Sequence, residues 1–67
     1  MQAEIISIGT ELLLGEITDT NAQYLSSRLR DIGVNVYRRS TVGDNPGRLL
    51  GAFKEAISRA DLIIATG

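Results

Sequence analysis

The sequence contains no cysteine and no histidine. These absences exclude disulfide bonds, zinc sites built from thiolates or imidazoles, thiol nucleophiles, and relays that pair serine or cysteine with histidine. Any acid–base chemistry must therefore use carboxylates, lysine, tyrosine or metal-bound water. A lack of cysteine also fits a reducing compartment, and we expect a cytoplasmic protein.

The chain also has little net charge and no long apolar run. Seven lysine and arginine residues against eight aspartate and glutamate residues give a net charge of −1, which argues against the basic stripe that nucleic acids or anionic membranes require. Residues Met1–Glu4 lack the basic leader of a signal peptide, and the apolar stretch that follows is too short to span a membrane. We expect neither a nucleic-acid nor a membrane partner.

The composition that is present is typical of a small folded domain. Hydrophobic residues make up 43% and charged residues 22% of the 67 positions, which is too apolar for a disordered chain. A chain of this length buries only about 60% of its unfolded surface. We therefore expect it to fold, but with low stability.

Three segments have the pattern of β-strands. Ala3–Gly9 and Asp61–Gly67 are short, nearly continuous apolar runs that end in glycine, which predicts strands buried on both faces. Between them, Val34–Val42 is rich in β-forming residues, but Arg38 and Arg39 interrupt its apolar pattern. That pattern predicts an edge strand, where charged side chains discourage pairing with other chains.

Two helices are predicted between these strands. The first begins with the capping box Thr20–Gln23 and ends near Ile32, ahead of Gly33. The second follows Asn45, which can cap it, and has Pro46 in its first turn. Apolar residues at helical spacing mark the expected buried faces: Ala22, Leu25, Leu29 and Ile32 in the first helix, and Leu49, Leu50, Phe53, Ala56 and Ile57 in the second.

The alternation of strands and helices predicts an α/β fold with three layers, α/β/α, around a mainly parallel sheet. If the two apolar strands are neighbours and the polar strand lies outside, the strand order is 2-1-3 and the helices cover opposite faces. The crevice between the carboxyl ends of the first and third strands is then a topological switch point, where such sheets bind ligands. Because the third strand still needs a covering helix, we expect residues 1–67 to be the N-terminal part of a single domain that is incomplete after that strand.

This crevice is the main candidate site. Gly9, Thr10 and Glu11 follow the first strand, and Thr66 and Gly67 end the third. Their backbone N–H groups, hydroxyls and carboxylate could meet a phosphate or a ribose there. The alternative is that Gly9 only permits a turn and that Glu11 is solvated. We favour a functional role because of the position in the fold, although no Walker loop or dinucleotide-binding glycine motif is present.

Two other segments allow two interpretations each. Leu12-Leu13-Leu14 lies in a connection, where three apolar residues predict either a subunit or domain interface or a short helical turn folded onto its own sheet. Gly43-Asp44-Asn45, at the end of the second strand, could offer a carboxylate to a metal or a ribose. The same residues also suit a turn and a helix cap, and that interpretation is favoured.

Taken together, four stretches closely resemble the start of CinA-like (competence/damage-inducible) proteins, whose N-terminal domain belongs to the MoaB/Mog molybdopterin-binding superfamily. They are Ile8–Gly15 (IGTELLLG), Asp19–Asn21, Val42–Asn45 and the terminal Thr66-Gly67. The resemblance covers the whole chain. It implies a three-layer α/β domain that binds a nucleotide or a pterin-like small molecule and forms homo-oligomers.

The resemblance also implies an activity. CinA-like N-terminal domains are associated with metal-dependent ADP-ribose pyrophosphatase activity, and a separate C-terminal domain, absent here, with nicotinamide-nucleotide deamidation. The implied cofactor of the intact protein is a divalent metal of unknown identity. The implied catalytic residues are Glu11 and Asp44, and the implied ligand-binding residues are Gly9, Thr10, Asn21, Asn45, Thr66 and Gly67. Since the family's glycine-rich continuation and acidic pair would follow Gly67, we expect this portion alone to be inactive.

Three functions are therefore open. The leading hypothesis is metal-assisted hydrolysis of a nucleoside diphosphate sugar such as ADP-ribose by the intact protein. The second is a non-catalytic domain that holds a molybdopterin-like or nucleotide ligand for a neighbouring domain. The third is a structural and oligomerisation module that uses Leu12–Leu14 as its contact.

Overall fold

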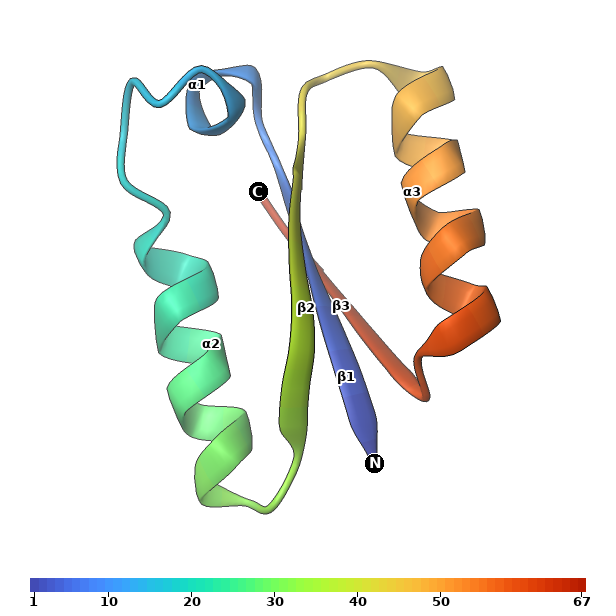
Figure 1. Cartoon of the computed structure of the whole chain (residues 1–67). Coiled ribbons are helices and arrows are strands. Elements are labelled where there is room, and N and C mark those ends of the chain that lie inside the picture. Colours follow the sequence, from blue (N-terminus) through green and yellow to red (C-terminus); the bar gives the residue numbers. More distant parts are fainter.

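The computed structural model describes all residues, 1–67, and shows three layers (Figure 1). A central sheet is covered by one long helix on each face, as the sequence predicts. A single helical turn follows the first strand. In chain order the elements are β1 (Gln2–Ile8), α1 (Thr10–Leu13), α2 (Thr20–Asp31), β2 (Asn35–Val42), α3 (Pro46–Arg59) and β3 (Leu62–Thr66). No helix in the structure is both long enough and apolar enough to cross a membrane.

The sheet has the predicted strand order, β2-β1-β3, and both pairings are parallel. β1 is central, and its residues from Ala3 to Ser7 are buried. β2 lies at an edge, as its arginines indicate. β3 differs from the prediction, because its side chains are half-buried or exposed instead of buried on both faces. The physical reason is that β3 has a hydrogen-bonded neighbour on one side only.

Two apolar clusters hold the helices against the sheet. On one face, Ala3 and Ile5 of β1 pack with Ala22 and Leu29 of α2. On the other face, Ile6 and Val42 pack with Ala56 of α3. Successive residues of a strand point to opposite faces, so the continuous apolar run of β1 supplies both clusters. Burial of these side chains fixes the position of β1 and of the segment that leaves its carboxyl end.

The helix boundaries follow the sequence, with one correction at a cap. Asn45 caps α3, since its Oδ1 accepts a hydrogen bond from the N–H of Arg48 at 3.0 Å. Gly33 stops the chain after α2 in a left-handed conformation with φ of 81°. The predicted capping box at Thr20 was wrong, because the N-cap of α2 is Asp19. The carboxylate of Asp19 accepts a hydrogen bond of 3.0 Å from the N–H of Ala22, and Thr20 is already the first helical residue.

The predicted buried faces of the helices were too wide. Leu50 and Ile57 of α3 are 56% and 68% exposed, and Ile32 at the end of α2 is 73% exposed. Leu50 and Ile57 each follow a residue that packs on the sheet by one position, which is about 100° around the helix axis. Ile32 lies past the last helical residue, where the stripe of α2 no longer faces the sheet.

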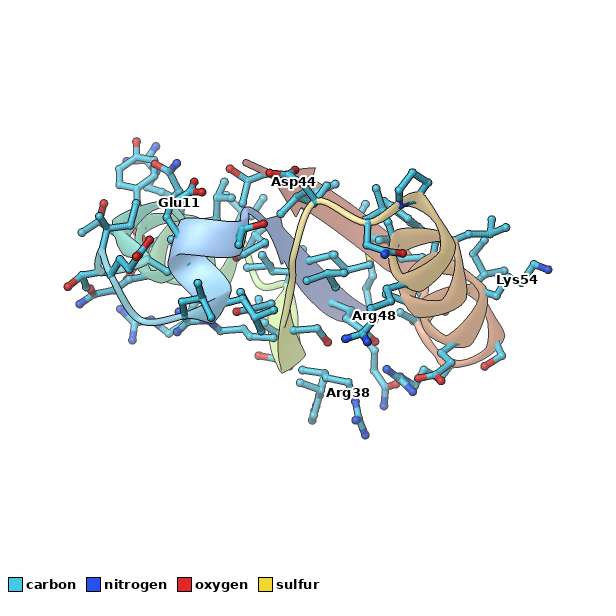
Figure 2. The ribbon with its side chains drawn as sticks, turned by 90° about the horizontal axis from the view of Figure 1, so that it is seen from above. Glu11, Arg38, Asp44, Arg48 and Lys54 are labelled. Atoms are coloured by element: carbon cyan, nitrogen blue, oxygen red, sulfur yellow. The ribbon has the colours of Figure 1, made fainter.

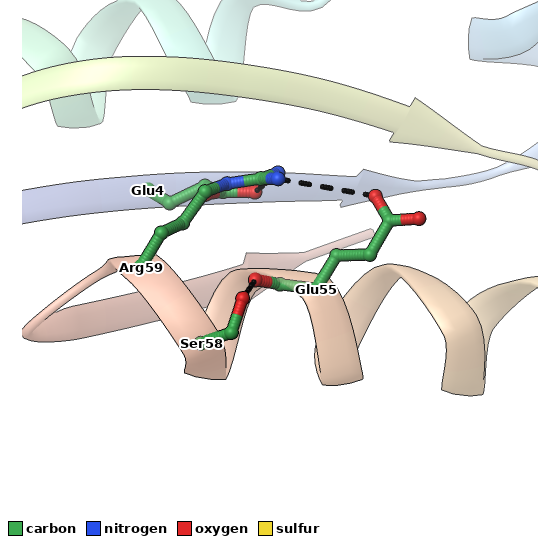
Figure 3. Close-up of polar contacts among 4 residues, drawn as sticks. All are labelled: Glu4, Glu55, Ser58 and Arg59. Carbon is green, nitrogen blue, oxygen red and sulfur yellow. Dashed lines mark hydrogen bonds and ion pairs between the residues drawn. The ribbon is translucent and has the colours of Figure 1, made fainter.

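One charged group is buried at the opposite end of the sheet from the candidate site. Glu4 on β1 is 2% exposed and accepts two hydrogen bonds from the guanidinium of Arg59, at 2.9 and 3.0 Å (Figure 3). Arg59 also lies 3.9 Å from the exposed carboxylate of Glu55. This bidentate pair ties the end of α3 to the start of β1 and compensates the burial of the Glu4 charge.

Candidate ligand-binding site

A pocket of about 230 Å³ lies at the carboxyl ends of β1 and β3. This is the predicted switch point, so the pocket occupies the position where an open α/β sheet binds ligands. α1 and the connection to α2 form one side of it, and the end of β3 forms another. The lining residues are Glu11, Leu12, Ile17, Thr18, Asp19, Thr20, Asn21, Thr66 and Gly67.

Four of the residues predicted from the sequence line this pocket together: Glu11, Asn21, Thr66 and Gly67. Glu11 lies on the exposed side of α1, and its carboxylate folds back over Gly9. A Cβ atom at Gly9 would stand 2.7 Å from the Glu11 Oε1 atom, so glycine leaves the space that this carboxylate occupies. Gly67 also packs closely against its surroundings, since a Cβ atom there would lie 3.0 Å from the carbonyl oxygen of Ile8.

The other predicted residues lie at the same end of the molecule but do not line the pocket. The backbone N–H of Gly9 donates a hydrogen bond of 2.9 Å to the carbonyl of Val42. This N–H is therefore not available to a ligand, contrary to the expectation from the sequence. The hydroxyl of Thr10 faces the end of β2, where it accepts a hydrogen bond of 3.2 Å from the N–H of Asp44. Asn45 uses its side-chain oxygen as the cap of α3.

Glu11 and Asp44 are therefore held at one end of the sheet on different elements. Figure 2 shows Glu11 on α1 and Asp44 on the connection between β2 and α3. The Asp44 carboxylate is exposed and lies outside the pocket that Glu11 lines. Thr10, the residue before Glu11, links the two segments, because its hydroxyl accepts a hydrogen bond from the backbone N–H of Asp44.

Asp19 is a residue of this pocket that the sequence reasoning did not select. One of its oxygens accepts the hydroxyl of Ser7, which is 1% exposed on β1, and the other accepts the N–H of Ala22. The hydrogen bond from Ser7 is the largest cause that lowers the pKa of Asp19 below its ordinary value of 3.8. The hydrogen bond from Ala22 and the charge of Arg39 lower this pKa further. Asp19 is therefore ionised at neutral pH and fixes the start of α2 beside the end of β1.

We expect the Ser7–Asp19 hydrogen bond to make the fold sensitive to acid. A carboxylate with a lowered pKa in the folded state contributes stability above its unfolded pKa, and this is lost as the pH falls through the folded pKa. Ser7→Ala should therefore reduce the free energy of unfolding by about 1 kcal/mol at pH 7. The difference from wild type should disappear progressively below about pH 4. Urea unfolding at several pH values measures this.

The matched control for this experiment is Ser26→Ala. Ser26 also donates its hydroxyl within the fold, at 2.8 Å, but to the backbone carbonyl of Ala22, which does not titrate. Its effect on stability should not change across the same pH range. If Ser7→Ala and Ser26→Ala showed the same pH dependence, the coupling of Ser7 to an ionised Asp19 would be disproved.

Leu12-Leu13-Leu14 agrees only in part with the second interpretation, a short helical turn folded onto its own sheet. Thr10–Leu13 is a helical turn, as one interpretation proposed, and Leu12 is half-buried. Leu13 and Leu14 are not folded onto the sheet, because they are 49% and 66% exposed. Ile17, further along the connection from β1 to α2, is also exposed, at 55%.

Comparison with known proteins agrees with this architecture. The family model described as a probable molybdopterin binding domain matches residues 4–67. A CinA-like protein of Dictyoglomus turgidum is 63% identical over the whole chain, and a putative competence-damage inducible protein of Clostridium novyi is 60% identical. The chain spans 16% of the length of each of these relatives.

A solved structure has the same fold. The crystal structure of CinA from Thermoplasma acidophilum, a protein of unknown function, superposes with a TM-score of 0.94 at 32% sequence identity. The match covers 98% of this chain and 39% of that protein. The match of the family model over nearly all residues, the identities with CinA-like proteins and this superposition agree with one another. The chain belongs to the probable molybdopterin-binding domain family, in the form found in CinA-like proteins.

Proposed function

We propose that the pocket at the ends of β1 and β3 binds a phosphate-bearing nucleotide or pterin-like small molecule. The observation that carries this proposal is the convergence of Glu11, Asn21 and Thr66, from three separate segments, on one pocket at the switch point. The family supports the same class of ligand, since its model is described as a probable molybdopterin binding domain.

The lining groups suit the parts of such a ligand. The carboxylate of Glu11 can accept hydrogen bonds from ribose or pterin N–H and O–H groups, whereas the amide of Asn21 and the hydroxyl of Thr66 can donate to phosphate oxygens. The pocket also lies at the start of α2, a helix of 12 residues whose N-terminal end attracts anions. Asp19 is not available to the ligand in the same way, since both its oxygens already accept hydrogen bonds within the protein.

The residues of this chain do not form a metal centre by themselves. No three carboxylate, histidine or cysteine side chains come together in the structure. Two carboxylates line the pocket, those of Glu11 and Asp19, and both oxygens of Asp19 already accept hydrogen bonds within the protein. Asp44 lies outside the pocket. A divalent metal therefore does not fit a site made only from these residues, and the roles proposed for Glu11, Asn21 and Thr66 are binding and orientation of the ligand.

For the whole protein we propose hydrolysis of a nucleoside diphosphate sugar such as ADP-ribose, in which water cleaves the bond between the two phosphates. The test is incubation of the whole protein with ADP-ribose, with and without a divalent metal, and separation of the products. Equal amounts of AMP and ribose 5-phosphate are expected. Binding of ADP-ribose without cleavage would disprove the hydrolase and leave the binding function. If ADP-ribose were neither bound nor cleaved, both the hydrolase and the binding function would be disproved.

A non-catalytic binding domain that forms homo-oligomers is the second candidate. It is favoured by the exposed apolar side chains of Leu13, Leu14 and Ile17 in the connection that leads from β1 past the pocket, which an assembly could cover. This proposal predicts that the whole protein is oligomeric and that Leu14→Glu lowers its mass in light scattering. An unchanged mass after this substitution would show that these residues are not part of a subunit interface.

A further inference from the structure

The largest hollow on the molecule lies away from the candidate site. It has a volume of about 560 Å³ and lies between α2 and the edge strand β2. Its walls are mostly polar. Ser26, Ser27 and Arg30 come from α2, and Asn35, Val36, Tyr37 and Arg39 come from β2. None of these residues belongs to the pocket at the ends of β1 and β3, so we call this hollow the arginine groove and treat it as a separate feature.

A β-bulge in β2 places Arg39 on the face of the sheet that α2 covers. Ala3 pairs with Val36, but Glu4 pairs with Arg38, so Tyr37 is an extra residue without a partner on β1. After the bulge, Arg39 pairs with Ile5, which packs on the α2 face. Without the bulge, the alternation of side chains along β2 would place Arg39 on the face of the sheet that α3 covers. Bulges of this kind re-aim side chains and are frequent beside functional sites.

The same bulge separates Arg38 from Arg39. Arg38 pairs with Glu4, whose side chain is on the α3 face with Arg59, and Figure 2 shows Arg38 on that side of β2. If the strand only needed charge to protect its edge, either face would serve equally well. The bulge instead places one arginine of the pair on the wall of the largest hollow, which Arg30 of α2 also lines.

The guanidinium groups of Arg30 and Arg39 have no ion-pair partner in the structure, where the only arginine in an ion pair is Arg59. The charge of Arg39 contributes to the lowered pKa of Asp19, but the two side chains are not within ion-pair distance of each other. Two like charges from different elements therefore face one hollow without a counterion, on a chain whose net charge is −1. Such an arrangement costs repulsion unless an anion binds between the charges.

We propose that the arginine groove is a second binding site, for a small molecule with two or more phosphate groups. Guanidinium groups bind phosphate oxygens through paired N–H donors, and two of them from α2 and β2 suit two adjacent phosphates. The volume of the groove is within the range of small-molecule sites. The ring of Tyr37 at its rim can stack on a planar group attached to the phosphates. This inference does not depend on the function proposed for the first pocket.

The test is titration of the protein with inorganic pyrophosphate, followed by isothermal calorimetry and by the NMR shifts of backbone amides. Shifts are expected at Arg30, Tyr37 and Arg39, with weaker binding at higher salt. Arg39→Gln and Arg30→Gln should each weaken binding about fivefold, and the double substitution more strongly. Arg48→Gln is the matched control, because Arg48 is an exposed arginine without an ion-pair partner on α3, and it should have no effect.

Two outcomes would overturn the proposal. One is an equal loss of affinity in Arg48→Gln and Arg39→Gln, which would show non-specific attraction to surface charge. The other is the absence of shifts around the groove while the protein remains folded. Glu11→Gln separates this site from the first pocket, because it should leave pyrophosphate binding in the groove unchanged. Titration with a phosphorylated nucleoside then shows whether the planar group near Tyr37 adds affinity.

Discussion

Arg59→Met is expected to destabilise the protein by about 2–3 kcal/mol, because it leaves the carboxylate of Glu4 buried without its partner. Breaking a fully buried ion pair typically costs about 3–5 kcal/mol, and the value here is lower because the side chain of Arg59 is 36% exposed. A core of this size supplies only about 3–5 kcal/mol of net stability. The variant should therefore keep only about 0–3 kcal/mol of stability and be partly unfolded at 25 °C, as circular dichroism and urea unfolding would show.

Two further substitutions make this result specific. Glu55→Gln removes the exposed carboxylate 3.9 Å from Arg59 and should change stability by less than about 0.5 kcal/mol. Glu4→Met combined with Arg59→Met replaces the pair by apolar groups and should recover most of the lost stability. If Arg59→Met were as mild as Glu55→Gln, the Glu4 charge would have another source of compensation.

Glu11→Gln is expected to weaken binding of a nucleotide ligand by the whole protein roughly tenfold to a hundredfold. Loss of one hydrogen bond to a charged group inside a site costs on the order of 1.5–3 kcal/mol, which corresponds to that range. Glu11 lines the pocket at the ends of β1 and β3. Calorimetric titration with ADP-ribose measures the effect, and any hydrolysis should decrease in parallel.

Glu16→Gln is the matched control. Glu16 lies five residues further along the same connection, is exposed, and does not line the pocket. Its substitution should change the binding free energy by less than about 0.5 kcal/mol. Equal and small effects of the two substitutions would make Glu11 an ordinary surface carboxylate, and the role proposed for the pocket would then be wrong.

The architecture could be predicted from the sequence because the strongest signals agree with one another. The apolar runs of β1 and β3 and the charged β2 imply the order β2-β1-β3, and the alternation with helices implies parallel pairing. The cap at Asn45 and the stop at Gly33 were also correct. In each case one local preference of the residue, for a cap or for positive φ, was enough to decide the structure.

The errors occurred where tertiary contacts decide between equivalent local patterns. Both Asp19 and Thr20 can cap a helix, and only the buried hydroxyl of Ser7, 12 residues away in the chain, favours Asp19. Leu50 and Ile57 have the same helical spacing as buried residues, but the contact with the sheet uses a narrower stripe of α3. The bulge at Tyr37, which separates Arg38 from Arg39, has no signal in the sequence.

Part of the candidate site was predictable for the same reason as the fold. Glu11, Thr66 and Gly67 follow strands whose carboxyl ends meet, so their proximity follows from the topology. Asp44 and Asn45 follow β2, which is on the other side of β1, so the strand order separates them from β3. The hydrogen bond from Asp44 to Thr10 depends on the shape of the turn at α1, which the predicted loop did not include.

The most direct test of the proposed site is a crystal structure of the whole protein with ADP-ribose bound. The binding role proposed for this pocket predicts that the phosphates or a ribose of the ligand lie at the ends of β1 and β3, within hydrogen-bond distance of Glu11, Asn21 or Thr66. A ligand that binds elsewhere, with the pocket between α1 and β3 filled only by water, would contradict it.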